Sequence, residues 1–162
     1  MNGMTDAAAG GIVYLDASVI IFGLEGEPSI SAPIKELLNA LRKSPRAGVT
    51  IEMTLAETLV GPEMERNPRL RRLYLELLVS SAYIDLRPIE RDILIESARL
   101  RAHHKTAHNK KLKLPDAIHL VTAIRARCRY FLSADKEIIP PAQMVAIRPD
   151  GKGIDDILRA LA

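Results

Sequence analysis

Short apolar segments alternate with segments of helical periodicity along almost the whole chain, and this alternation limits the folds open to it. A helix is indicated where apolar residues recur at the 3.6-residue period, as at Ile34, Leu37, Leu38 and Leu41. Strands are expected at 12–15, 48–52, 83–86, 129–133 and 144–147. Strands that alternate with helices favour a mostly parallel sheet with right-handed crossovers and helices on both faces. The pattern therefore predicts an α/β fold.

The boundaries of the helices are expected at capping residues, glycines and prolines. Ser31 and Pro33 predict the start of a second helix, after a break at 25–28, and Gly61-Pro62 predicts the end of a third. A long helix is expected from about 89 to 105, followed by a basic loop. The other helices are expected at 17–24, 70–78, 115–126 and 154–161.

Length and composition favour a single domain. With 162 residues, one domain over residues 11–162 is expected, after a flexible tail at 1–10. Cys128 is the single cysteine, which indicates a reducing compartment such as the cytoplasm, and it is expected to be a small core residue. The apolar run from Ala17 to Leu24 is far shorter than the roughly 18 residues that a membrane span needs. We therefore expect a cytoplasmic protein without a signal peptide.

Acidic residues stand where four of the predicted strands and helices meet. Asp16 ends the first strand, Glu57 lies in the helix after the second, and Asp116 begins the helix after the basic loop. Asp135 follows the fourth strand. In open parallel sheets, ligands bind outside the carboxyl ends of the strands. The four carboxylates are therefore candidates for one shared site.

Each acid also has a purely structural interpretation. Asp16 and Asp116 have the positions of helix N-caps, and Thr54 with Glu57 matches a capping box. Asp135 fits a turn in which its carboxylate binds nearby backbone. Considered singly, each residue is explained by these roles.

Considered together, the four carboxylates indicate a cation. Crowded like charges raise one another's pKa, and a hard divalent ion with oxygen ligands offsets the repulsion. Mg²⁺ or Mn²⁺ fits best, with Asp16 and Asp116 as direct ligands and Glu57 and Asp135 as outer ligands or water-orienting groups. Ser18 and Ser133 are candidates for hydroxyls that hold the carboxylates, or for ordinary turn and cap hydroxyls.

A basic segment precedes Asp116. Residues 97–115 contain no acid, and they include three of the four histidines. The segment is either a solvated surface or a track for RNA phosphates, for which the candidates are Lys105, Lys110, Lys111 and Lys113. His104 and His108 have the spacing of a metal pair, but the surrounding lysines oppose a cation. His119 is expected to be a packed or hydrogen-bonded helix residue rather than a general base.

Four motifs resemble those of the PIN-domain ribonucleases, and among them the VapC-like toxins of toxin–antitoxin pairs. The matching segments are Tyr14-Leu-Asp-Ala-Ser18, Thr54-Leu-Ala-Glu57, Leu114-Pro-Asp-Ala-Ile-His-Leu-Val-Thr-Ala123 and Phe131-Leu-Ser-Ala-Asp135, which span about residues 12–148. The resemblance implies a three-layer α/β/α fold, RNA cleavage, and a Mg²⁺ or Mn²⁺ site at the four acids. It also implies a homodimer and a small antitoxin that blocks the site.

The fourth motif departs from the family pattern, because Lys136 and Glu137 follow Asp135. Glu137 is therefore an alternative fourth acid. Two other functions remain open: a PIN-like module that binds nucleic acid or a partner without cleavage, and a receiver-like signalling domain, which also gathers acids around Mg²⁺. Asp16 has no acidic neighbour, whereas receiver domains usually carry two adjacent acids early in the chain.

Overall fold

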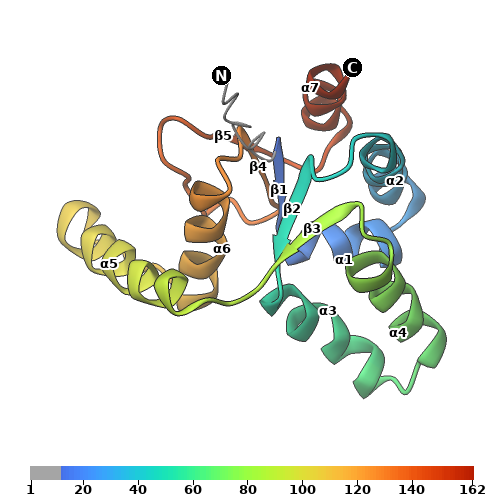
Figure 1. Ribbon diagram of the computed structural model, residues 1–162, viewed down its shortest axis with the longest axis horizontal. Helices are drawn as coiled ribbons and strands as arrows, with labels where there is room; N and C mark the ends of the chain where they lie inside the picture. Colours follow the sequence, from blue (N-terminus) through green and yellow to red (C-terminus); the bar gives the residue numbers. More distant parts are fainter. Residues whose placement is uncertain (1–11) are drawn as a thin grey trace, which may run out of the picture.

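The computed structural model describes residues 12–162 and is organised around a five-stranded sheet (Figure 1). The strands stand in the order β3-β2-β1-β4-β5, and every neighbouring pair is parallel. Their bounds are β1 Val13–Leu15, β2 Gly48–Ile51, β3 Ile84–Arg87, β4 Tyr130–Leu132 and β5 Val145–Ile147. The predicted tail at 1–10 and the predicted first domain residue, Gly11, lie outside the described residues.

The order of the strands distinguishes this sheet from that of a receiver domain. The chain builds β1, β2 and β3 toward one edge and then crosses to the other side of β1, where it adds β4 and β5. Receiver domains have the order 2-1-3-4-5. The receiver-like interpretation is therefore wrong. The change of direction makes the gap between β1 and β4 a topological switch point, where parallel sheets form their ligand sites.

Helices cover both faces of the sheet, which gives the three-layer α/β/α architecture that the sequence predicted. In Figure 1, α5 and α6 lie on one side of the strands, whereas α1, α2 and α7 lie on the other. A short π-helix, η1, continues α4. The bounds are α1 Ala17–Glu25, α2 Pro28–Lys43, α3 Met53–Met64, α4 Pro68–Leu75, η1 Glu76–Ser80, α5 Arg91–His108, α6 Leu114–Arg125 and α7 Gly151–Leu161.

The two apolar layers follow from the alternation of side chains along the strands. Val13 and Leu15 of β1 are buried among residues of α1 and α2. Tyr14, which lies between them, points to the opposite face and is buried with Leu120 of α6. Its ring stacks on that of Phe131 in β4, with 5.1 Å between the ring centroids. Buried side chains on both faces thus fix the position of β1, which precedes Asp16.

Three predicted helix boundaries are wrong. Helix α2 begins at Pro28 rather than near Ser31, because a proline at the first helical position loses no hydrogen bond, and Pro33 lies inside the helix. Helix α3 continues through Pro62 to Met64, so Gly61-Pro62 does not end it. Helix α5 continues to His108 and ends at Asn109, which has the left-handed conformation common after helices. The basic loop is therefore shorter than predicted.

No helix within residues 12–162 is long and apolar enough to cross a membrane.

Candidate active site

Asp16 lies at the switch point between β1 and β4. It has the N-cap position of α1, but its side chain makes no capping bond. Instead, its Oδ2 accepts hydrogen bonds from the hydroxyls of Ser18 and Ser133, each at 2.7 Å. Because Ser133 directly follows β4, the carboxylate joins the ends of two strands that are 117 residues apart in the chain. The N-cap interpretation therefore does not explain its side chain.

Glu57 approaches Asp16 through a buried histidine. The N-cap of α3 is Glu52, so Thr54 and Glu57 do not form the capping box that the sequence allowed. The Nε2 atom of His119 lies 2.9 Å from Oε2 of Glu57 and 3.6 Å from Oδ1 of Asp16. His119 is 1% exposed, and its Nδ1 lies 2.7 Å from the hydroxyl of Tyr14. One imidazole thus contacts the first two predicted acids.

Asp116 lies in the first turn of α6, where the N-cap residue is Lys113. Burial raises the pKa of its carboxyl, and the neighbouring carboxylates of Asp135 and Asp16 raise the pKa further. Lys113 and His119 oppose this shift. Asp116 therefore interacts electrostatically with Asp135 and Asp16.

Asp135 has the turn role that the sequence allowed. Its Oδ1 accepts the backbone N–H of Glu137 at 2.8 Å, while its own N–H donates to Oγ of Ser133 at 3.0 Å. The Nη1 of Arg148 donates to the backbone oxygens of Ser133 and Asp135 at 3.2 and 2.6 Å. The turn interpretation is thus correct for Asp135, and its charge also raises the pKa of Asp116. Glu137 itself is exposed.

Hydrogen bonds and charges link the four acids in pairs, but the acids do not form a metal cage. Within residues 12–162, no group of three or more His, Cys, Asp and Glu side chains is arranged to hold a metal ion. Mg²⁺ usually retains several waters and takes only one or two protein carboxylates together with substrate phosphate. The carboxylates of Asp135 and Asp16 repel that of Asp116, and a divalent cation would relieve this repulsion. Carboxylate oxygens are also the ligands that Mg²⁺ prefers, so these residues fit such an ion.

A comparison with family models decides the classification. The model described as PIN domain matches residues 13–140, which is most of the chain and includes all four acids. The chain belongs to the PIN-domain family. No protein of curated function matches the sequence significantly.

Solved structures share the fold of this PIN domain at low sequence identity. FitAcB from Neisseria gonorrhoeae is 20% identical with a TM-score of 0.65, over 85% of this chain and 98% of that one. VapBC2 from Rickettsia felis, bound to a promoter DNA fragment, is 14% identical with a TM-score of 0.63 and the same coverages. A toxin–antitoxin complex from Klebsiella pneumoniae is 24% identical with a TM-score of 0.59, over 86% and 98% of the two chains.

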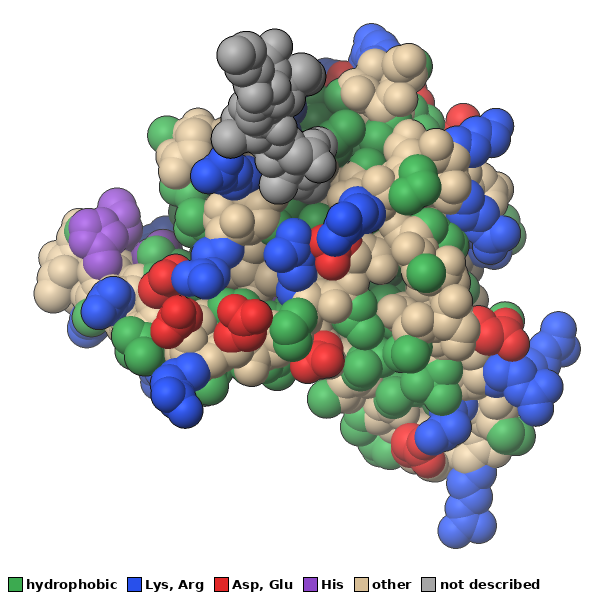
Figure 2. Space-filling model, viewed as in Figure 1, with side chains coloured by type: hydrophobic (Ala, Val, Ile, Leu, Met, Phe, Trp, Pro, Cys, Tyr) green, Lys and Arg blue, Asp and Glu red, His purple; other side chains and the backbone are tan. Residues whose placement is uncertain are grey.

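The predicted basic segment reaches the acidic cluster of this PIN domain at one end. Lys105 lies on the last helical residues of α5, where its Nζ donates to Oδ1 of Asn109 at 3.1 Å. Lys110 and Lys111 are exposed in the connection to α6, and Lys113 is close enough to Asp116 to lower its pKa. Elsewhere on the face in Figure 2, Lys and Arg side chains are interspersed with acidic ones.

The three neighbouring histidines gather at the outer end of α5 (Figure 2). The ring centroids of His104 and His108 are 5.3 Å apart. Partial burial lowers the pKa of His104, and His108, His103 and Lys110 lower it further. The cluster lines a cavity of about 500 Å³ together with apolar residues of α5 and α6. It contains none of the four acids.

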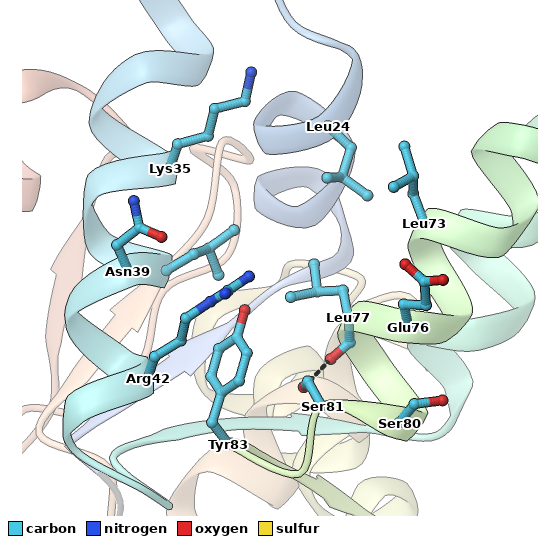
Figure 3. Close-up of a pocket in the computed structure, with 11 residues that line it drawn as sticks. Leu24, Lys35, Asn39, Arg42, Leu73, Glu76, Leu77, Ser80, Ser81 and Tyr83 are labelled. Atoms are coloured by element: carbon cyan, nitrogen blue, oxygen red, sulfur yellow. Dashed lines mark hydrogen bonds between the residues drawn. The ribbon is translucent and has the colours of Figure 1, made fainter.

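A cavity of about 750 Å³ lies between α1, α2 and the α4–η1 segment (Figure 3). Leu24, Leu73 and Leu77 line it, and Arg42 packs over the ring of Tyr83, 5.4 Å from its centroid. None of the predicted site residues lines this cavity. The candidate active site is therefore identified by its charges and hydrogen bonds rather than by the depth of a pocket.

Sequence reasoning missed two residues that support the acids. Tyr14 contacts His119, and Arg148 holds the backbone of Ser133 and Asp135. Arg148 was detectable in principle, because it directly follows β5 and so lies at the carboxyl edge of the sheet. Tyr14 gave no such signal, since an aromatic residue inside a buried strand is ordinarily a core residue.

Proposed function

We propose that this PIN domain is a Mg²⁺- or Mn²⁺-dependent endoribonuclease that hydrolyses RNA phosphodiester bonds, as the toxin of a toxin–antitoxin pair. The observations that carry the proposal are the contacts that link Asp16 to Glu57 through His119 and to Asp135 through Ser133. Besides burial, the charges of Asp135 and Asp16 raise the pKa of Asp116. A nearby cation relieves such repulsion, and a metal ion beside a phosphate is a common means of phosphodiester hydrolysis.

The residues have separate roles in this proposal. Asp16 and Asp116 would hold the divalent ion, while Glu57 and Asp135 serve as outer ligands or orient water. Ser18 and Ser133 hold the Asp16 carboxylate by hydrogen bonds to Oδ2, which leaves Oδ1 directed toward His119. When bound, the ion would supply positive charge that lowers the pKa of water and offsets the charge that develops on the phosphate.

The basic segment is the proposed track for the RNA backbone. Lys113 links it to the acidic cluster, because this residue both caps α6 and lowers the pKa of Asp116. A phosphate beside Lys113 would therefore lie next to the carboxylates. Lys105, Lys110 and Lys111 continue the track along exposed surface.

The proposed partners are a cognate antitoxin, which blocks the site, and a second copy of the chain. The fold similarity to the toxin–antitoxin complex from Klebsiella pneumoniae supports an antitoxin partner. The single cysteine, Cys128, is buried, and burial raises the pKa of its thiol to about 12. An inert thiol of this kind is compatible with the proposed cytoplasmic location.

Purified protein and an RNA pool test the activity directly. Wild-type protein should produce RNA fragments with Mg²⁺ or Mn²⁺ and none with EDTA, whereas Asp16→Asn and Asp116→Asn should lose activity by orders of magnitude. Cleavage at the wild-type rate by both variants would contradict the assignment. RNA that is retained without fragments would instead support a non-cleaving module, which the incomplete metal cage also allows.

The toxin role has a separate test. Expression of the wild-type chain should arrest growth, and expression of Asp16→Asn should not. A short neighbouring reading frame that encodes a DNA-binding segment and a disordered tail should restore growth when it is co-expressed. Normal growth with the wild-type protein at the same abundance as the variant would contradict the toxin role.

A further inference from the structure

The hydrogen bonds around His119 connect the apolar core to two acids of the site. Its Nδ1 lies 2.7 Å from the hydroxyl of Tyr14, which is fully buried in β1. Its Nε2 faces Oε2 of Glu57 at 2.9 Å and Oδ1 of Asp16 at 3.6 Å. The imidazole belongs to α6 and thus contacts Tyr14 within β1, Glu57 in α3, and Asp16, which directly follows β1.

The chemistry of these groups gives the direction of one hydrogen bond. A carboxylate only accepts hydrogen bonds, so Nε2 carries hydrogen and donates to Glu57. The hydroxyl of Tyr14 can either donate to Nδ1 or accept from it. The contact with Tyr14 therefore holds the ring in place whether or not Nδ1 carries hydrogen.

We propose that His119, held in place by Tyr14, is a positioning residue whose Nε2–H donates to Glu57 and keeps that carboxylate beside Asp16. This inference rests on the proposed function, since the paired carboxylates are the proposed metal-binding and water-orienting groups. His119 contacts neither substrate nor metal in this arrangement. Both of its ring nitrogens are engaged by protein groups, so it does not act as a general base.

The geometry explains why Glu57 needs such a partner. Its side chain is 32% exposed, whereas Asp16 is held by two hydroxyls. A glutamate that extends from a helix into solvent has several rotamers, and loss of this freedom costs free energy. The rigid, buried imidazole limits Glu57 to the rotamers that approach Asp16, and the contact of Nδ1 with Tyr14 holds the orientation of the ring.

The first test is whether Nε2 of His119 carries hydrogen in metal-free protein, measured by ¹⁵N NMR of the histidine side chains, with His119→Gln to assign the signal. We expect hydrogen on Nε2 in wild-type protein at pH 7.5. Tyr14→Phe removes only the hydroxyl that contacts Nδ1 and should shift the ring signals. A wild-type Nε2 without hydrogen would overturn the inference.

The second test is Mn²⁺ affinity, measured by calorimetry without RNA. His119→Leu should weaken binding about 10- to 100-fold, as is usual for loss of a group that orients a metal ligand. Tyr14→Phe should weaken it by a smaller factor, and His119→Gln, which keeps an N–H donor, should retain more affinity than His119→Leu. Affinity equal to wild type in His119→Leu would overturn the inference.

A matched control separates positioning from general loss of structure. Ser97→Ala removes one buried hydrogen bond, from Oγ to the backbone oxygen of Ile93 at 2.7 Å, in helix α5. It should change neither the His119 signals nor Mn²⁺ affinity.

In RNA cleavage, the His119 and Tyr14 variants should lower kcat without raising KM. If the wild type does not cleave RNA, the proposed function fails, while the hydrogen on Nε2 and the Mn²⁺ affinities still decide the inference.

Discussion

At the scale of single residues, the site is a set of carboxylates in unequal environments. Asp16 is buried and accepts two hydroxyl bonds, whereas Asp116 lies beside other carboxylates that raise its pKa. The protein therefore holds the carboxyl group of Asp16 with hydrogen bonds and leaves that of Asp116 beside other carboxylates. This difference supports two roles in ion binding. Asp16 is already held in position, whereas a bound cation would relieve the repulsion at Asp116.

Asp116→Asn should make the metal-free protein more stable at pH 7.5, because the variant removes a carboxylate with a raised pKa. A folded-state pKa above the unfolded value means that the native state holds its proton more tightly, so ionisation costs stability above the folded pKa. The gain should disappear as the pH falls below about 3.9, the usual value for an unfolded aspartate. Urea unfolding at a series of pH values measures this difference.

Asp92→Asn is the matched control, since Asp92 also lies in the first turn of a helix but is exposed. It should lose about 0.3–1 kcal/mol at pH 7.5, because it removes a favourable charge at a helix N-terminus. An Asp116→Asn variant that is less stable than wild type in metal-free buffer would contradict the proposed repulsion.

Ser133→Ala should lower metal-dependent cleavage about 10- to 100-fold, because Oγ of Ser133 holds both the Asp16 carboxylate and the backbone N–H of Asp135. The free energy of unfolding should fall by only about 1–3 kcal/mol. Ser81→Ala, which removes a bond to the backbone oxygen of Leu77 near the cavity of Figure 3, should leave cleavage unchanged. Equal activity of Ser133→Ala and wild type would contradict the supporting role.

At the scale of elements, the connection between α5 and α6 has two functions. It ends α5 at Asn109, in the left-handed region with φ of 49°, and places the N-cap of α6 at Lys113. It also carries the exposed Lys110 and Lys111 toward the acidic cluster. The same five residues thus orient Asp116 and supply positive charge beside it.

Replacement of Lys110, Lys111 and Lys113 by serine should raise KM for RNA with little change in kcat. The slope of log affinity against log salt should become shallower by about two, since each phosphate contact to a single strand contributes about 0.7. Filter binding with Asp16→Asn in place of the active protein measures affinity without cleavage. The same change at the exposed Lys35, Lys43 and Lys152 should not alter the slope, and equal slopes in both triple variants would contradict the track.

At the scale of the whole molecule, ion binding should couple the layers of the fold. Asp16 belongs to the β1–α1 junction, Glu57 to α3 and Asp116 to α6, so an ion held among them would connect elements on both faces of the sheet. Binding to the folded state alone raises stability by mass action.

Mn²⁺ should therefore raise the Tm of the wild-type protein. At a concentration 100 times the Kd, the expected gain in free energy is about 2.7 kcal/mol. The Asp16→Asn/Asp116→Asn double variant should show no such rise, although it should have a Tm at least equal to that of metal-free Asp16→Asn. Differential scanning calorimetry measures both effects, and a Mn²⁺-dependent rise of equal size in the double variant would contradict binding at the acids.

The sequence predicts the alternation of strands and helices and the four motifs, because these features depend on local periodicity and residue type. The strand positions were correct within one or two residues, and the PIN-domain resemblance is confirmed by the family match. Helix boundaries at Pro33 and Pro62 were not readable, because burial of Ile34 and Thr58 on the inner faces of α2 and α3 outweighs the loss of a backbone hydrogen bond at a proline.

The sequence by itself determined the fold class, since apolar patterning selects the sheet, and its short motifs predict which acids lie at the carboxyl edge of that sheet. Only the tertiary structure decided how those acids are held. The order of the strands brings Ser133 to Asp16, and the packing of α6 on β1 brings His119 between Tyr14 and Glu57. These contacts join residues 62 to 117 positions apart, and such distances in the chain leave no local pattern from which a partner can be read.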